Sequence, residues 1–151
     1  MSLGGGNPEL QEVAQQLEEI EERREALEAE IETVQAEKRE VDEAIEAIET
    51  LETGSTVQVP LGGGAYVRAE IEDIDEVVVE LGGGYAAERE QEGAVDTLEN
   101  KKDTLDDRID EIQSQITELE TESEELEERA QELQTQQMQQ MQQQQQQQQD
   151  E

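Results

Sequence analysis

Apolar residues recur at alternating intervals of three and four in two long segments, one on each side of a glycine-rich central stretch. This spacing forms one narrow stripe on a helix, and its mean of about 3.5 residues is typical of a left-handed coiled coil. The first stripe, or seam, is Leu10, Val13, Leu17, Ile20, Arg24, Leu27, Ile31, Val34, Lys38, Val41, Ile45 and Ile48. The second seam is Val95, Leu98, Lys102, Leu105, Ile109, Ile112, Ile116, Leu119, Ser123, Leu126, Ala130 and Leu133. We predict two helices that pair antiparallel, because the central stretch returns the chain.

Residues 7–53 are expected to form the first coiled-coil helix, about 65–70 Å long at the usual rise of 1.5 Å per residue. Asn7 is a good N-cap and Pro8 suits the first helical position, while Gly54 is available for a left-handed cap at the other end. Residues 94–135 are expected to form the second helix. We expect a flexible N-terminus at residues 1–6 and a glutamine-rich disordered tail, or a fraying helix, at 136–151.

Arg24 and Lys38 interrupt the apolar seam of the first helix. Their aliphatic stems can pack on the seam while the charges reach water. Alternatively, polar seam residues select the register of the two helices. In the expected antiparallel register, Lys102 lies near Ile45.

The central stretch, residues 54–93, reads as two β-hairpins that turn on the same sequence, Leu-Gly-Gly-Gly, at Leu61–Gly64 and Leu81–Gly84. Alternating apolar and polar residues flank both turns, and glycine permits the positive φ values of tight turns. Isolated hairpins are marginally stable and leave open edges, so we expect an assembly head that pairs with other chains. The candidate assembly residues are Val57, Val59, Val67, Ile71, Val77, Val79 and Leu81.

The chain is strongly acidic, with 10 Lys and Arg against 43 Asp and Glu and a net charge of −33. Such a surface disfavours binding to nucleic acids and to anionic membranes. It fits a salt-rich cytoplasm, where screening removes self-repulsion, or an acidic chaperone for basic proteins. The sequence shows no secretory signal and no apolar run long enough for a membrane span. We therefore expect a cytoplasmic location.

Candidate chemistry is sparse, because the chain contains no His and no Cys. Neither glycine triplet is followed by Gly-Lys-Ser/Thr, so no phosphate-binding loop is predicted. Asp73 and Asp75 resemble the start of a calcium loop, but Val78 stands where that loop requires glycine. Paired carboxylates need a concave, desolvated pocket for catalysis, which a helix pair does not supply. We expect no cofactor, no metal and no enzymatic activity.

Two motifs carry a resemblance to a known family. They are Val-Pro-Leu-Gly-Gly-Gly-Ala-Tyr-Val at 59–67 and Val-Glu-Leu-Gly-Gly-Gly-Tyr-Ala-Ala-Glu-Arg at 79–89. With the flanking helices, over about residues 7–135, they resemble the archaeal prefoldin alpha subunit. The extreme acidity resembles a halophilic form.

The resemblance implies a mainly α fold whose two β-hairpins form a β-barrel head within an oligomer. It implies a hexamer of two alpha and four beta subunits. The family holds unfolded polypeptides at the coiled-coil tips without ATP and delivers them to a group II chaperonin.

The ends of the two helices are the candidate client contacts. At the last turns a seam lacks neighbours, so we expect fraying and exposed aliphatic side chains, and methionine adds adaptable contacts. Removing 136–151 alone should weaken binding only in part, because two methionines are a minor share of this apolar surface. A structural spacer and an acidic binder of basic proteins remain alternative functions. The candidate contacts are Leu10, Val13, Leu17, Leu126, Ala130, Leu133, Met138 and Met141.

Overall fold

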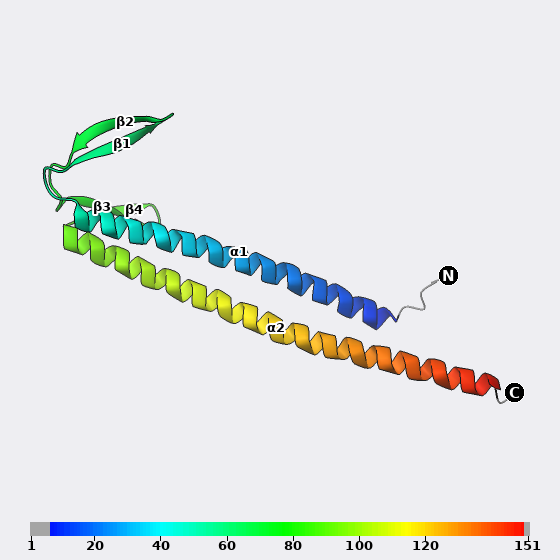
Figure 1. The fold of residues 1–151 in the computed structure, drawn as a ribbon. Coiled ribbons are helices and arrows are strands. Elements are labelled where there is room, and N and C mark those ends of the chain that lie inside the picture. Colours follow the sequence, from blue (N-terminus) through cyan, green and yellow to red (C-terminus); the bar gives the residue numbers. More distant parts are fainter. Residues whose placement is uncertain (1–6, 150–151) are drawn as a thin grey trace. The chain divides into compact units, whose positions relative to one another are not determined.

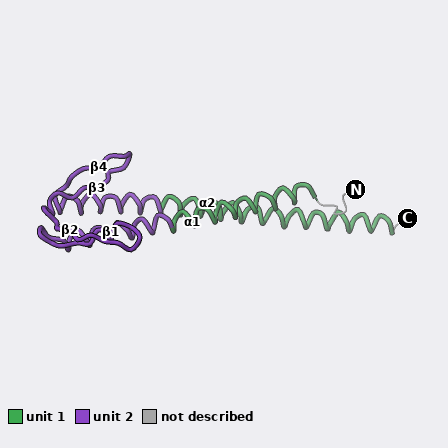
Figure 2. The backbone as a smooth tube through the Cα atoms, turned by 90° about the horizontal axis from the view of Figure 1, so that it is seen from above, with its two compact units in different colours: residues 1–32, 110–151 green, residues 33–109 purple. Residues whose placement is uncertain are grey.

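Along the chain, one long helix precedes four short strands and a second long helix follows them (Figure 1). The computed structural model describes residues 7–149, which fall into two compact units (Figure 2). Unit 1 comprises residues 1–32 and 110–151, and unit 2 comprises residues 33–109. The predicted fold class, two helices separated by two hairpins, is confirmed. The elements are α1 (Pro8–Thr50), β1 (Thr56–Gly62), β2 (Ala65–Glu70), β3 (Val77–Gly82), β4 (Tyr85–Arg89) and α2 (Gln91–Gln149).

Helix α1 begins as expected and ends three residues before the expected boundary. The Asn7 side-chain oxygen accepts a hydrogen bond from the Glu9 N–H at 3.0 Å, which is the predicted N-cap. The last helical residue is Thr50 rather than residue 53. Gly54 has a φ of +90°, but its N–H donates to the Ile71 carbonyl at 2.8 Å. Gly54 therefore shapes the connection to the strands instead of capping the helix.

Helix α2 begins at Gln91, three residues before the expected start, and Gln91 caps the end of α1. Its side-chain amide donates to the backbone carbonyls of Ile48 at 2.7 Å and Leu51 at 3.1 Å. Carbonyls at the end of a helix have no partner within that helix. The first turn of α2 thus satisfies the last turn of α1, a contact between residues 40 or more apart in sequence.

The disordered tail expected at 136–151 is not observed over residues 136–149, which continue α2 as a regular helix to Gln149. Glutamine is among the better helix formers, and the segment contains no glycine or proline to stop it. The fraying-helix alternative is nearer to this outcome. The expected flexible N-terminus, residues 1–6, and residues 150–151 lie outside the described part of the chain.

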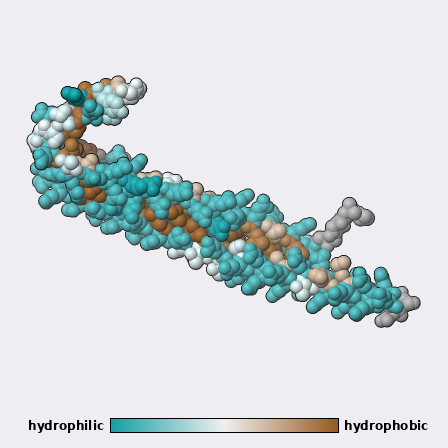
Figure 3. Space-filling model, in the orientation of Figure 1, coloured by the Kyte–Doolittle hydropathy of each residue, from teal (hydrophilic) through white to brown (hydrophobic). Residues whose placement is uncertain are grey.

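The predicted seam is confirmed, because every seam residue of both helices is buried or half-buried. In α1, five of the six buried residues recur every seven positions, as a coiled coil requires. The rest of the visible helix surface is mostly hydrophilic, with the hydrophobic residues in a narrow band (Figure 3). These buried α1 residues are Val13, Ile20, Leu27, Val34 and Val41.

A reciprocal pair of ion pairs joins the two helices within unit 2. The Lys38 Nζ lies 2.6 Å from the Asp106 Oδ1, and the Lys102 Nζ lies 2.5 Å from the Asp42 Oδ1. Each helix supplies a Lys followed by an Asp four residues later, so we call the four residues the ion-pair clasp. Lys102 lies one turn from the position expected near Ile45, and the antiparallel register is correct to within that turn.

Within the clasp, Lys102 stays protonated at neutral pH. The hydrogen bond to the Asp42 carboxylate raises the pKa of Lys102 above its ordinary value. A raised lysine pKa contributes stability that is fully present below the unfolded pKa, about 10.4, and is lost only as pH rises through the folded value. Lys38 reaches across to Asp106 of α2, and this contact favours the register-selecting interpretation of Lys38.

The clasp predicts an electrostatic coupling between Lys38 and Asp106. The reversals Lys38→Asp and Asp106→Lys should each lower the melting temperature, and the double reversal should recover most of the loss. We expect a coupling of about 0.5–1 kcal/mol near 0.1 M KCl, which shrinks in molar salt. Thermal melts over a double-mutant cycle measure it. Arg39→Asp, an equal charge change on an exposed neighbour, is the control; losses that simply add would refute the clasp.

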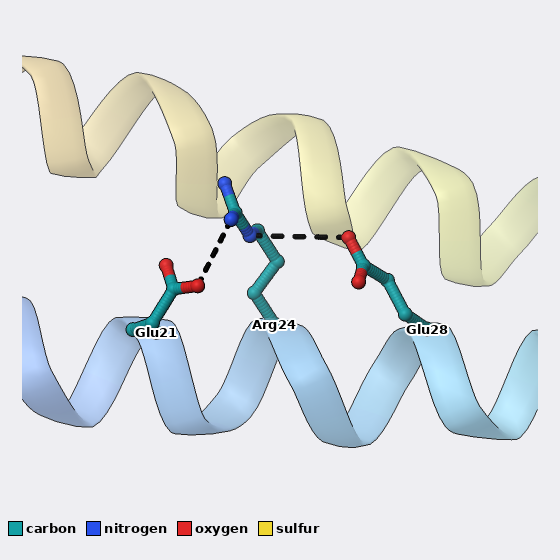
Figure 4. A network of polar contacts seen from close by, with 3 residues as sticks. All are labelled: Glu21, Arg24 and Glu28. Carbon is teal, nitrogen blue, oxygen red and sulfur yellow. Dashed lines mark hydrogen bonds and ion pairs between the residues drawn. The ribbon is translucent and has the colours of Figure 1, made fainter.

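Arg24, the other polar seam residue, stays on its own helix in unit 1. Its guanidinium lies 3.0 Å from the Glu21 carboxylate and 3.9 Å from that of Glu28 (Figure 4). Its Nε is buried and lacks a hydrogen-bond partner. Arg24 therefore fits the stem-packing interpretation only in part, because its Nε is buried and its charge is held by Glu21 and Glu28 of the same helix.

Each hairpin in unit 2 is a two-stranded antiparallel sheet with an identical turn. β1 pairs with β2 to form hairpin 1, and β3 pairs with β4 to form hairpin 2. Both glycine triplets have positive φ at all three positions: 96°, 61° and 81° at 62–64, and 93°, 63° and 82° at 82–84. The predicted need for glycine in these turns is confirmed. Each register shifts at the leucine before the triplet, Leu61 or Leu81.

Candidate functional site

Hairpin 1 presents one apolar face. Val57 lies opposite Ala69, and Val59 lies opposite Val67, so these four side chains share a face of the sheet. Val59 is 41% exposed and Val67 is 47% exposed. We call Val57, Val59, Val67 and Ala69 the open face of hairpin 1, because the chain itself leaves its outer part uncovered.

In hairpin 2, the equivalent valines, Val77 and Val79, pack against the helices of the same chain. Val79 is only 6% exposed, and it joins a core with residues of both helices. Val77 packs against the same core. Both were expected to contact other subunits, and the structure places them against their own chain instead. The helix residues of this core are Val41, Ile45, Ala94 and Leu98.

The two hairpins repeat one pattern at a spacing of 20 residues, Val-x-Val-x-Leu-Gly-Gly-Gly, beginning at Val57 and at Val77. One copy is docked on the helices through its second valine, and the other copy leaves that valine exposed. Ile71 is half-buried beside a depression of about 570 Å³ at the base of the hairpins. Within unit 2, hairpin 1 therefore leaves Val59 exposed on an apolar face, whereas hairpin 2 buries the equivalent Val79.

Sequence reasoning missed several exposed apolar residues next to the turns. Leu81 was expected at the assembly surface and is 50% exposed. Its counterpart Leu61 is 67% exposed, because the register shift turns it out of the alternating pattern. The position next to each glycine triplet was the available signal. Tyr66 and Tyr85, which closely follow the triplets, were also missed, at 62% and 77% exposure, as was Val78 near the start of β3, at 65%.

The eight candidate client contacts divide by exposure within unit 1. Val13 and Leu133 are buried, at 7% and 5%. Leu10, Leu17, Leu126 and Ala130 are half-buried. The expected exposure of these six aliphatic residues is therefore not observed, because the opposite helix covers the seam up to its last described turns. Met138 and Met141 are exposed, at 64% and 57%.

Helix α2 continues beyond the described part of its pairing with α1. Glu9, in the first turn of α1, lies 3.8 Å from Arg129 of α2. Because α1 begins at Pro8 and the helices run antiparallel, the α2 residues that follow Leu133 have no described α1 residue opposite them. Figure 1 shows this extension of α2 past the start of α1. Met138 and Met141 lie on it.

Like charges crowd the exposed faces of both helices. Glu18 and Glu22, and likewise Glu120 and Glu124, are exposed carboxylates one turn apart. Arg129, one turn after Glu125 on α2, lies 3.8 Å from Glu9 of α1. Each like-charge pair one turn apart costs a few tenths of a kcal/mol at low salt, about 0.2–0.5.

Salt should therefore stabilise the chain. The screening length falls to about 3 Å at 1 M salt, which removes most of this repulsion. We expect helicity to rise from about 0.1 M to molar KCl, with a melting temperature higher by several degrees, at about 2–4 °C per kcal/mol for a chain of this size. Circular dichroism measures both quantities. A flat or falling salt dependence would contradict the salt-adapted interpretation.

The described residues offer little geometry for catalysis. A depression of about 350 Å³ between the helix ends is lined by three carboxylates, Glu49, Glu92 and Asp96, which are all exposed to solvent. No group of three or more potential metal ligands from His, Cys, Asp and Glu occurs in residues 7–149. Over the same residues, neither helix combines the length and hydropathy needed to cross a bilayer.

These features define a coiled-coil protein that carries two β-hairpins between its helices. A family model described as Prefoldin subunit matches residues 20–151, which is most of the chain. The chain therefore belongs to the prefoldin family. This outcome confirms the resemblance drawn from the hairpin motifs.

The similar sequences are archaeal prefoldin alpha subunits. A "Prefoldin subunit alpha" of Haloarcula marismortui is 84% identical over 49 residues, which is 32% of each chain. The matched part thus spans about a third of that relative. The protein of the same name from Halorubrum lacusprofundi is 59% identical over 100 residues, 66% of each chain. Both organisms are halophilic archaea, so the predicted halophilic type is confirmed as well.

Two solved structures share the fold. A chain of filamentous prefoldin from Methanocaldococcus jannaschii is 29% identical, with a TM-score of 0.52, covering 80% of this chain and 97% of that one. The prefoldin beta subunit from Thermococcus strain KS-1 is 21% identical, with a TM-score of 0.56 and coverages of 84% and 93%. The second likeness concerns the fold alone.

Proposed function

We propose that the chain is an alpha-type subunit of a cytoplasmic prefoldin hexamer with two alpha and four beta subunits. The complex holds unfolded polypeptides without ATP at the ends of its helices and delivers them to a group II chaperonin. One observation carries this proposal. Met138 and Met141 are exposed on the part of α2 that has no described α1 residue opposite it.

The open face of hairpin 1 supports the assembly part of the proposal. Its valines are exposed in the single chain, and both strands of hairpin 1 have a free edge. Exposed apolar surface next to unpaired strand edges favours pairing with strands of other chains. Assembly through hairpin 1 leaves the helix ends available for clients.

The methionines support the client part. Methionine is flexible and polarisable, so it adapts to many apolar partners. Weak contacts at several helix ends of one complex add up through avidity. A complex of this kind can therefore hold different unfolded chains without a shaped pocket and without nucleotide.

An acidic binder of basic proteins is the second candidate, because of the net charge of −33. The two functions differ in their dependence on client charge. A holdase prevents the aggregation of a neutral unfolded client, whereas an acidic binder acts only on basic clients.

The test is aggregation of a chemically unfolded client followed by light scattering in molar KCl without ATP. The chain is assembled with its beta-type partner, and one neutral and one basic client are compared. Suppression of both clients is expected. Suppression of the basic client alone would favour the acidic binder, and suppression of neither would leave a structural spacer.

A further inference from the structure

The chain changes character abruptly at its C-terminal end. Every charged residue except Asp150 and Glu151 precedes Gln134, although the whole chain carries a net charge of −33. Residues 134–149 contain only Gln, Thr and Met, and we call them the neutral segment. They are helical throughout, and all are exposed apart from Gln137, which is half-buried.

The neutral segment combines two kinds of binding group. Met138 and Met141 are three residues apart, so they are neighbours on the helix surface, and both are more than half exposed. The surrounding glutamine amides each offer donors and an acceptor. An apolar pair in a field of amides matches the backbone and apolar side chains of an unfolded polypeptide.

The surface before the neutral segment offers a different environment. Exposed glutamates cover α1 and the earlier part of α2. A carboxylate loses strong hydration when a neutral chain covers it, and this desolvation is far more costly than that of an amide. Carboxylates also attract or repel clients according to their charge, to an extent that depends on salt. Because the neutral segment carries no carboxylate, a client that binds it neither desolvates a charge nor meets attraction or repulsion from the segment itself.

We propose that the neutral segment binds the uncharged stretches of unfolded chains, and that it does so independently of the net charge of the client. The segment packs aliphatic client side chains against Met138 and Met141, while glutamine amides pair with client backbone groups. This inference rests on the proposed holdase function and adds the class of client segment to it. Binding through this surface remains effective in molar salt.

The test uses three fluorescein-labelled peptides of 15 residues that share the same Leu and Val positions. The remaining positions are all Ser and Gln, all Lys, or all Glu. Binding to the full chain assembled with its partner is measured by fluorescence anisotropy between 0.15 and 3 M KCl. For the Ser/Gln peptide we expect a Kd that changes by no more than about threefold over this range. In 3 M KCl the three peptides should converge.

Two variants and a matched control isolate the segment. Met138→Gln with Met141→Gln removes the apolar pair, and Gln139→Glu with Gln140→Glu and Gln143→Glu adds three carboxylates. Each should raise the Kd of the Ser/Gln peptide about tenfold or more, also in 3 M KCl. The control adds three carboxylates at exposed positions of the paired helices and should leave that Kd unchanged. Its substitutions are Gln35→Glu, Gln113→Glu and Ser114→Glu.

The outcomes separate this inference from the proposed function. Tight binding of the Ser/Gln peptide by both variants would overturn the inference and leave the holdase intact. Failure of the unmodified complex to bind any peptide would refute the holdase itself. If the methionine variant instead lowers the mass of the assembly in analytical ultracentrifugation, the segment binds a second copy of the chain, and the inference is overturned.

Discussion

Replacing residues 56–90 with a short turn is expected to abolish entry of the chain into its complex while leaving a helical protein. The deletion removes both hairpins and with them the open face and its strand edges. It also uncovers the part of the helix core that Val79 covers, so some loss of melting temperature is expected. Co-expression with a beta-type partner, followed by native mass measurement, provides the readout.

A milder substitution avoids that loss of core. Val59→Thr with Val67→Thr keeps the β-branched shape and the directly opposed pair, but it makes the open face polar. Removing the apolar burial of two valines costs about 1 kcal/mol each, so assembly should weaken by about 30-fold. The neighbouring pair, Gln58→Thr with Arg68→Thr, lies on the other face and is the matched control. Full assembly of the chain without residues 56–90 would show that the hairpins are not the assembly site.

The coiled coil was predictable because its signal is long and local. A spacing of three and four held over both helices leaves one choice of buried face. Every seam residue is covered, including the six near the helix ends that were expected to be exposed. The reciprocal Lys and Asp of the clasp were visible too, but their pairing depends on register. A register error of one turn separates Lys102 near Ile45 from Lys102 bound to Asp42.

The hairpin surface was only partly predictable, because Val57 and Val77 stand in the same local sequence. Which copy docks on the helices is decided by contacts with residues such as Val41 and Ala94, far away in the chain. Local alternation also missed Leu61, which the register shift turns out of the pattern. The glutamine segment was interpreted from its low complexity, although glutamine itself favours the helix that is observed.

Removal of residues 1–16 together with 131–151 is expected to abolish suppression of client aggregation while the complex remains assembled. The hairpins are untouched, so the assembly surface is unchanged. The cut removes the exposed methionines and the terminal aliphatic residues Leu10, Val13 and Leu133. The remaining outward helix surface is mostly acidic and well hydrated, which makes it a poor site for apolar segments.

The exposure of the eight candidate client contacts raises the share of client binding that we expect from residues 136–151. Removal of 136–151 alone was expected to weaken holding only in part, because six aliphatic residues were assumed to be exposed as well. Since Val13 and Leu133 are buried and Met138 and Met141 are exposed, we now expect this shorter cut to remove most of the activity. Removal of 146–151 spares both methionines and serves as the control, which should hold clients like the full chain.

All three truncations should be compared in the same molar KCl, with assembly confirmed by mass and helicity by circular dichroism. Light scattering of a neutral client then reports holding alone. Loss of activity after removal of 136–151 but not of 146–151 locates the client contact at residues 136–145, around the two methionines. Undiminished suppression by a fully assembled complex that lacks both 1–16 and 131–151 would refute binding at the helix ends. The client site would then have to lie on the hairpins or along the paired helices.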